Sequence, residues 1–403
     1  MYRNLFKITY IQLFFMLTLI FTFLPSGIIY SSSQAEVVRK IIYVIQLVIY
    51  MITIEICFKK KSIRKLVNSC MIPFECWTAL LIVVTYIVSG DFYKTVRGGI
   101  YCLGIIAIFL SIQVMAQQGD IKMFKMFYNY FSVLNILNVL SAFIFINGIY
   151  NYSWHGATYM YGGKFTTFYM YYTWVCLYGI KNRAKSFTWY IIPLFIGWCL
   201  CIRINCSTGI ACIIFTIVCF FTRGMIKKIK PWILITTVIG ITLGIVLTDI
   251  IFNNSIIVTF ITEVLHRSSL MTGRVEIYEN FLNIISDYKW FGAGYDNTII
   301  TEGTTRGYLN AQNGILDIIT KTGVLGLTLF IMTIYNIWNK GYKLFSTTEN
   351  NFVEIFVLGF FFCAMVEISF NYYFYLLMAF IPINIESLIK MNQQKRRFSF
   401  QIR

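Results

Sequence analysis

Charged residues are scarce in this chain. Asp, Glu, Lys and Arg make up 13% of its 403 residues, against roughly 25% in an average soluble domain. Hydrophobic residues make up 58%. Because so little polar surface is left to face water, the composition excludes an ordinary soluble protein and predicts a polytopic membrane protein.

Histidine is almost absent, and cysteine lacks the spacing of a metal site. The chain has only His155 and His266, and its 11 Cys form no CxxC pair and no Cys/His cluster. Most of these Cys lie in apolar runs, where a thiol acts as a small packing residue. The sequence therefore predicts neither a zinc site nor another metal or cofactor site.

Apolar runs near the ~20 residues that cross a bilayer recur along the chain. They cover residues 8–30, 41–58, 71–89, 98–116, 124–147, 165–180, 187–202, 206–222, 232–252, 313–338, 352–370 and 371–389. Neither an internal repeat nor a low-complexity tract interrupts them. The pattern predicts an all-α protein, with residues 1–403 forming a single membrane domain of about twelve transmembrane helices.

The basic residues alternate between successive loops, and the formal net charge is +17. Most of the 34 Lys and Arg residues fall in loops on one side if the N-terminus is cytoplasmic. Cytoplasmic loops collect Lys and Arg, so the charge predicts topology and gives no reason to expect a nucleic-acid partner. We predict cytoplasmic N- and C-termini, an outward-facing loop at residues 253–312, and contact of the basic C-terminal tail with anionic membrane lipids.

The loop at residues 253–312 is the longest stretch that is not mainly apolar. Its charged residues include Arg267, Arg274, Glu276, Asp296 and Arg306. A membrane protein that keeps one long polar loop is expected to carry its function there.

Thr272-Gly273-Arg274 is typical of a helix start within this loop. Val275, Tyr278, Phe281, Leu282 and Ile285 follow at helical spacing and form one apolar face. Thr272 can cap this short amphipathic helix, which places Arg274 beside free backbone N–H groups, an arrangement suited to phosphate. The alternative is a helix lying on the membrane surface, with Arg274 at lipid headgroups.

Arg203 and Lys164 lie next to predicted spans on the outer side. Arg203 either faces a cavity or partner or snorkels at a helix end. Lys164 follows Gly162 and Gly163, and it either binds an anion or anchors the start of the next span.

Three shorter patterns lie near the end of the polar loop. Gly292 and Gly294 indicate a turn with unusual backbone angles, and Asn310 or Asn313 can cap the helix that follows. Asp317 and Lys321 are four residues apart and are expected to pair on one helix face.

Tyrosines are frequent near the ends of the predicted spans, as at Tyr43 and Tyr50. Most fit an interfacial aromatic belt. An outer group also suits stacking on sugar rings, and it comprises Tyr159, Tyr161, Tyr169 and Tyr308.

These patterns together resemble the O-antigen polymerase and O-antigen ligase family of bacterial envelopes. The matching segments are Thr272-Gly273-Arg274, Glu276–Tyr288, Gly292-Ala293-Gly294, Gln312-Asn313, Gly323-Val324-Leu325-Gly326, and the separate basic residues Arg203 and Lys164. The motifs cover about sixty residues, while the hydropathy layout is similar along the whole chain. Where the ligases of the family place a histidine, this chain has Gln312, which cannot accept a proton as a general base.

The resemblance implies a polymerase in the bacterial cytoplasmic membrane that joins repeat units of O-antigen, capsule or exopolysaccharide. Its substrate would be an oligosaccharide on polyprenyl (undecaprenyl) pyrophosphate, and a chain-length regulator would be a further partner. Catalytic roles are implied for Arg274, Arg203, Glu276 and Asp296. Substrate-binding roles are implied for Lys164, Arg267, Gln312, Asn313, Tyr278 and Arg306.

Some alternatives stay open at the level of sequence. The general base is Glu276, Asp296 or His266. A ligase that moves glycan to a lipid acceptor is a second function, which Gln312 disfavours. A flippase for lipid-linked sugars is a third, since Glu75 and Glu367 lie within apolar runs and ionisable groups in membranes often mark transport paths.

Overall fold

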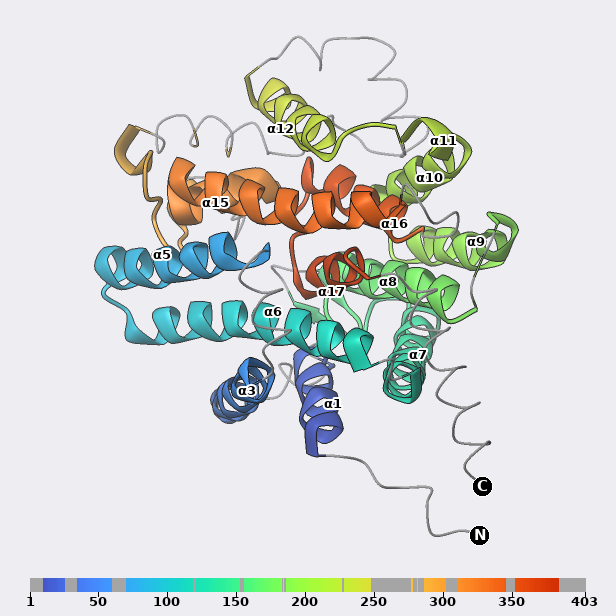
Figure 1. Ribbon diagram of the computed structural model, residues 1–403, viewed down its shortest axis with the longest axis horizontal. Coiled ribbons are helices and arrows are strands. Elements are labelled where there is room, and N and C mark those ends of the chain that lie inside the picture. The colour runs from blue at the N-terminus through green and yellow to red at the C-terminus, as the bar shows by residue number, and fades with distance from the viewer. Residues whose placement is uncertain are drawn as a thin grey trace.

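The computed structural model describes the backbone of thirteen parts of the chain. They are residues 10–25, 35–59, 70–118, 121–152, 156–182, 184, 186–226, 228–247, 277, 281, 286–301, 311–345 and 352–383. Nearly all of these residues belong to helices that pack into one bundle (Figure 1).

Each of the twelve apolar runs overlaps one main helix, and the lengths of these helices differ widely. These helices are α1 (Tyr10–Thr22), α3 (Ala35–Phe58), α5 (Ile72–Ser89), α6 (Phe92–Gln118), α7 (Ile121–Ile144), α8 (Lys164–Asn182), α9 (Thr188–Arg203), α10 (Ser207–Phe221), α12 (Pro231–Leu247), α15 (Gly314–Phe345), α16 (Val353–Ala364) and α17 (Tyr372–Phe380). The short helices α11 (Arg223–Ile226) and η3 (Ile299–Thr301) lie between them.

Five of the described helices are long and apolar enough to cross a membrane, which confirms a multi-pass membrane protein. They are α3, α5, most of α6, α7 and the first part of α15. Others are shorter, such as α16 with 12 residues and α17 with 9. The total of twelve crossings and the orientation of the termini stay predictions.

The centre of the bundle is formed by α17. All of its residues from Tyr373 to Phe380 are buried, and it packs against α6, α8 and α16 (Figure 1). Burial of α6 is similarly high, at 78% of its apolar window, whereas α3 buries only 28% of its window. The interior therefore forms around α6 and α17, and α3 lies at the periphery.

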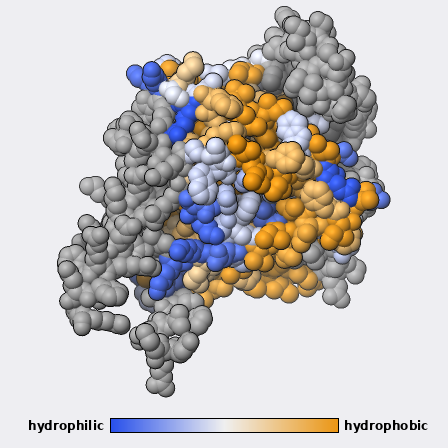
Figure 2. Space-filling view, turned by 90° about the vertical axis from the view of Figure 1, so that its right-hand side faces the viewer, coloured by the Kyte–Doolittle hydropathy of each residue, from blue (hydrophilic) through white to orange (hydrophobic). Residues whose placement is uncertain are grey.

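Large apolar side chains remain exposed on the peripheral helices. Ile192 and Phe195 of α9 are 71% and 66% exposed, and Val133 and Ile136 of α7 are 56% and 54% exposed. Figure 2 shows a broad hydrophobic surface on one side of the molecule. A soluble protein rarely exposes so continuous an apolar area, and contact with lipid explains it.

A small hairpin connects α7 and α8. Its strands β1 (Tyr150–Tyr152) and β2 (Gly156–Thr158) pair antiparallel, with Tyr150 opposite Thr158. The hairpin brings the chain back to Lys164, the first residue of α8.

Candidate functional site

The turn at residues 289–297 docks on a break in α15. Gly323 has φ 65° and ψ −167°, which interrupts the helical hydrogen bonds of α15. The turn replaces them: Ala293 N–H donates to Thr320 O (2.6 Å), and Gly294 N–H donates to Lys321 O (3.0 Å). In return, Val324 N–H donates to Lys289 O (2.9 Å). The break is stable because the turn pairs backbone groups that lipid could not satisfy.

Only glycine fits at the closest points of this contact. A Cβ at Gly323 would overlap the carbonyl group of Trp290, and a Cβ at Gly292 would overlap the Thr322 amide. Both glycines also have positive φ, which side chains disfavour. The two glycine motifs found in the sequence, at residues 292–294 and 323–326, therefore form one interface.

The same turn reaches α5 and α6. Tyr295 N–H donates to Thr85 Oγ1 near the end of α5 (2.8 Å), and Arg97 in the second turn of α6 forms an ion pair with Asp296 (2.8 Å). We call this part of the bundle the loop end: the end of α5, the starts of α6, α8, α15 and α17, and residues 289–297.

A cavity of about 280 Å³ opens at the loop end. Five tyrosines line it, namely Tyr43, Tyr101, Tyr295, Tyr372 and Tyr373. The ring centroid of Tyr101 lies 6.0 Å from that of Tyr295 and 5.0 Å from that of Tyr372. Burial raises the pKa of Tyr295, so its hydroxyl stays protonated and can donate a hydrogen bond.

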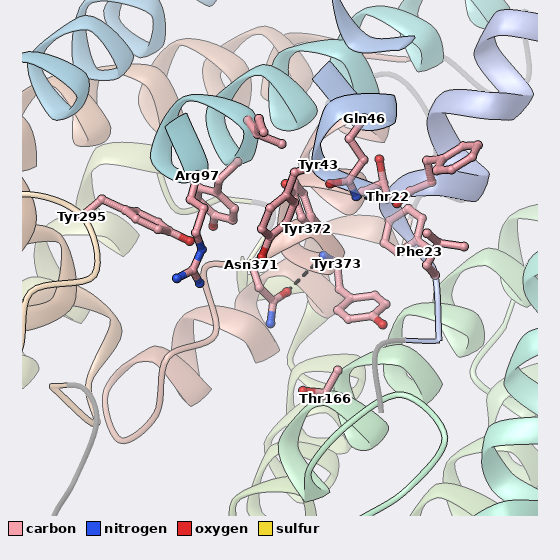
Figure 3. Close-up of a pocket in the computed structure, with 14 residues that line it drawn as sticks. Thr22, Phe23, Tyr43, Gln46, Arg97, Thr166, Tyr295, Asn371, Tyr372 and Tyr373 are labelled. Carbon is pink, nitrogen blue, oxygen red and sulfur yellow. Dashed lines mark hydrogen bonds between the residues drawn. The ribbon is translucent and has the colours of Figure 1, made fainter. Parts of the chain in front are cut away.

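Polar side chains from four helices and from the residue before α17 also line the cavity. They are Thr22, Gln46, Arg97, Thr166 and Asn371. Figure 3 shows the Arg97 guanidinium beside the hydroxyl end of Tyr295, with Asn371 close by and Thr166 facing them from the other side. The cavity thus combines aromatic rings with hydrogen-bonding groups.

Two basic residues predicted for the site, Lys164 and Arg203, each donate to a backbone carbonyl group. Lys164 Nζ donates to Asn205 O in the turn between α9 and α10 (3.3 Å), and Arg203 Nη2 donates to Phe143 O (3.1 Å). Asn205 has φ 52°, which is uncommon outside glycine. Lys164 lies in the first turn of α8, two residues before Thr166, which lines the cavity.

Asn313 caps α15, as one of the two alternatives predicted. Its Oδ1 accepts from Ile315 N (2.9 Å) and Leu316 N (3.1 Å), and its Nδ2 donates to Met365 O (2.7 Å). The side chain is fully buried. Gln312 precedes it with φ 49°, also in the left-handed region. Asn313 therefore ties the start of α15 to the connection between α16 and α17.

The expected pair on the first turns of α15 is confirmed. Lys321 Nζ lies 2.6 Å from Asp317 Oδ2, and the Lys321 ammonium lies 5.4 Å from the centre of the Tyr295 ring. Both side chains are largely buried, with exposed fractions of 22% and 14%.

The acidic residues that favoured a transporter lie at helix ends. Glu75 is in the first turn of α5. Glu367 is buried in the connection between α16 and α17, next to Met365 that accepts from Asn313. The run 352–370 is thus not one helix, and neither Glu75 nor Glu367 lies in the middle of a helix.

The outer tyrosines predicted to stack on sugars are packed inside the bundle. Tyr159, Tyr161 and Tyr169 are only 2%, 1% and 2% exposed, and none of them lines the cavity. Burial raises the pKa of Tyr159, and the charge of Arg203 partly opposes it. Tyr43, which the sequence assigned to the interfacial belt, lines the cavity instead.

Several candidates lie outside the described residues: His266, Arg267, Thr272, Arg274, Glu276, Tyr278, Arg306 and Tyr308. Two residues of the predicted amphipathic helix are described, and both are helical and buried. Phe281 belongs to the expected apolar face, whereas Ile277 was not assigned to it. In the described parts of the chain, no group of three His, Cys, Asp or Glu residues could hold a metal ion.

Arg97 was not among the residues singled out in the sequence. It stands in SGDFYKTVRGG, ahead of the predicted span 98–116 and on the side that the topology places outside. An arginine this close to an apolar run usually faces a partner or a cavity. Its position in the sequence could therefore have identified Arg97 as a candidate site residue.

The fold and this site define a multi-pass helical membrane protein with a polar cavity at one end of the bundle. Residues 192–331 match the family model described as O-antigen ligase. The match covers Arg203, the turn at 289–297 and the break in α15, and it confirms the resemblance to the O-antigen ligase and polymerase family. This family suggests a glycan-handling membrane enzyme of the ligase or polymerase type. No curated protein matches the chain.

Proposed function

We propose that this protein is a polymerase of surface polysaccharide on the outer face of the bacterial cytoplasmic membrane. It joins oligosaccharide repeat units that are linked to polyprenyl pyrophosphate. The observation that carries this proposal is a cavity lined by tyrosine and amide groups and by Thr166, two residues after Lys164, whose ammonium bonds to Asn205 O two positions after Arg203. A chain-length regulator as a further partner rests on the resemblance alone.

The two cations suit the pyrophosphate. Both use backbone carbonyl groups as partners, so their charges are not neutralised by an acidic residue in those contacts. Arg274, at the predicted helix start in the outer loop, is the third proposed cation. Pyrophosphate gains negative charge as it leaves, and fixed donors at that point stabilise the transition state.

The reaction is a glycosyl transfer between two lipid-linked units. A hydroxyl oxygen of one unit attacks the anomeric carbon of the glycan on the other. The bond from that carbon to the pyrophosphate oxygen breaks, and the oxygen keeps the electron pair. A carboxylate takes the hydroxyl proton.

Glu276 and Asp296 are the proposed bases. Asp296 Oδ2 is held by Arg97 at 2.8 Å, while Oδ1 accepts no hydrogen bond from any residue that the structure describes. Asp296 has φ 57°, in the left-handed region that Asp adopts more often than most residues with a side chain.

Gln312 favours polymerase over ligase. It stands at the position of the histidine in ligases of the family, and its amide cannot take a proton. If a lost base were the only difference, Gln312→His would begin to transfer glycan to a lipid acceptor. We expect no such transfer, and a lipid-acceptor product in this variant would support the ligase.

The banding of glycans from a deletion strain separates the functions. A polymerase is supported by glycan that reaches the surface only as single repeat units. Long chains that remain on the polyprenyl carrier would indicate a ligase, and lipid-linked units held on the cytoplasmic face would indicate a flippase. Re-expression of the intact chain should restore long polymer.

A further inference from the structure

The cavity at the loop end has the chemistry of a sugar-binding site. Its volume of about 280 Å³ lies near the lower end of small-molecule sites, which begin at roughly 300 Å³. This size suits a sugar ring. Four of the five lining tyrosines are half-buried, so part of each side chain is open to a ligand. The Tyr101 hydroxyl already donates to Phe370 O (2.8 Å).

Hydrogen-bonding groups of both kinds remain available in the cavity. Asn371 Oδ1 caps α17 by accepting from Tyr373 N and Phe374 N, whereas its Nδ2 donates to no described residue. In Gln46 the donor is used and the acceptor remains: Nε2 donates to Phe21 O (2.7 Å), which leaves Oε1 as an acceptor. Sugar hydroxyls both donate and accept, so this pair of groups matches them.

The charge in the cavity is balanced. Arg97 is the charged residue among the lining side chains, and Asp296 pairs with it at 2.8 Å. The guanidinium also lies 6.0 Å from the ring centre of Tyr43. A pyrophosphate needs uncompensated cations, and the two candidates, Lys164 and Arg203, bond to backbone carbonyl groups and do not line the cavity. The cavity itself is therefore suited to an uncharged ligand.

We propose that the cavity between Tyr43, Arg97, Tyr295 and Asn371 binds a neutral sugar residue of the lipid-linked substrate. The identity of the ligand rests on the proposed function, because that function supplies the glycan. The sugar stacks on the tyrosine rings and bonds to Asn371 Nδ2, the Tyr295 hydroxyl and Gln46 Oε1. Its pyrophosphate lies outside the cavity, at Lys164 and Arg203.

Two substitutions remove single groups from the cavity while keeping the fold. Tyr295→Phe removes the hydroxyl and keeps the ring that contacts Tyr101. Asn371→Ser removes the amide donor and keeps a residue that caps helices well. Tyr86→Phe is the matched control, since Tyr86 is 58% exposed on α5 and outside the cavity. Thermal unfolding of each variant checks the fold.

The test measures binding of free sugar to the full chain purified in detergent. The probe is the repeat-unit oligosaccharide, released by mild acid from the surface glycan of the cells that make the chain. Saturation-transfer NMR should detect it on the native protein and on Tyr86→Phe. Loss of one hydrogen bond should weaken binding by about 3- to 10-fold in Tyr295→Phe and in Asn371→Ser.

The outcomes distinguish this inference from the proposed function. No saturation transfer in the native protein, or equal binding by all variants, would overturn the sugar site even if polymer is made. Competition of inorganic pyrophosphate for the same site would overturn its neutral character. Sugar binding that needs Tyr295 and Asn371, in a protein whose deletion leaves polymer length unchanged, would uphold the site and reject the polymerase. Arg203→Ala should lose polymer and keep sugar binding.

Discussion

Arg97 Nη1 lies 2.8 Å from Asp296 Oδ2, although the two residues are 199 positions apart. The Arg97 guanidinium also lies 5.8 Å from the centre of the Tyr93 ring. The side chains are 25% and 44% exposed. This contact fastens the turn at 289–297 to the start of α6 and places a donor and an acceptor at the mouth of the cavity.

The Arg97–Asp296 pair should stabilise the protein only modestly. Half-exposed ion pairs are worth about 0.2–1 kcal/mol, since water and salt screen them. Asp296→Asn and Arg97→Gln should each lower the free energy of unfolding by about that amount. The double variant should lose no more stability than either single variant, because both substitutions remove the same interaction. A double-mutant cycle from chemical unfolding in detergent measures the coupling. Fully additive losses would contradict the contact, and high salt should reduce the coupling.

Gly323→Ala should disrupt the loop end. The added Cβ would overlap the Trp290 carbonyl group, and the backbone of an alanine is strained at φ 65°. We expect a loss of stability of about 1–3 kcal/mol from the backbone angle and a further loss from the displaced turn. Gly240→Ala is the control, because a Cβ there meets nothing within 4 Å in helix α12. Thermal unfolding of both variants decides this prediction, and equal stability would show that the turn does not dock on the break.

Arg274 should be needed for polymer synthesis. Removing one donor that stabilises a leaving oxygen typically costs roughly 10²–10³ in rate. Arg274→Ala should therefore remove most long polymer at a normal protein level in the membrane. Arg274→Lys keeps the charge without the planar guanidinium and should retain part of the activity.

The competing role of Arg274 at lipid headgroups gives a different result. One such contact is worth only about 1 kcal/mol, so Arg274→Ala would then make nearly normal chains. Arg183→Ala, in a loop predicted to be cytoplasmic, is the matched control and should be silent. Polymer length on a gel and immunoblots of membranes provide both measurements.

The predicted orientation places the loop end outside the cytoplasm. A single cysteine at Asn283 should react with a membrane-impermeant thiol reagent in whole cells, and one at Ser62 should not. The background is a chain whose 11 native cysteines have been replaced. Labelling at Ser62 without labelling at Asn283 would reverse the topology and remove the access of outward-facing glycan to the cavity.

Local features of the sequence determined which segments became helices. In lipid, a long apolar run must satisfy its backbone hydrogen bonds within itself, so each of the twelve runs contains a helix. The Asp317–Lys321 pair was predictable because residues four apart share a helix face. The cap at Asn313 was predictable because an amide oxygen can reach the N–H groups two and three residues ahead.

Contacts between distant segments were decided only by the tertiary structure. An apolar pattern shows which residues leave water, but it does not show which helices become neighbours. Arg97 meets Asp296 across 199 positions, and Trp77 donates to Thr322 across 245. The sequence contained the two glycine motifs, but only the fold showed that the turn at 292–294 repairs the break at Gly323. The cavity arises in the same way, because Tyr43, Tyr295 and Asn371 come from three separate parts of the chain and meet only when the helices pack.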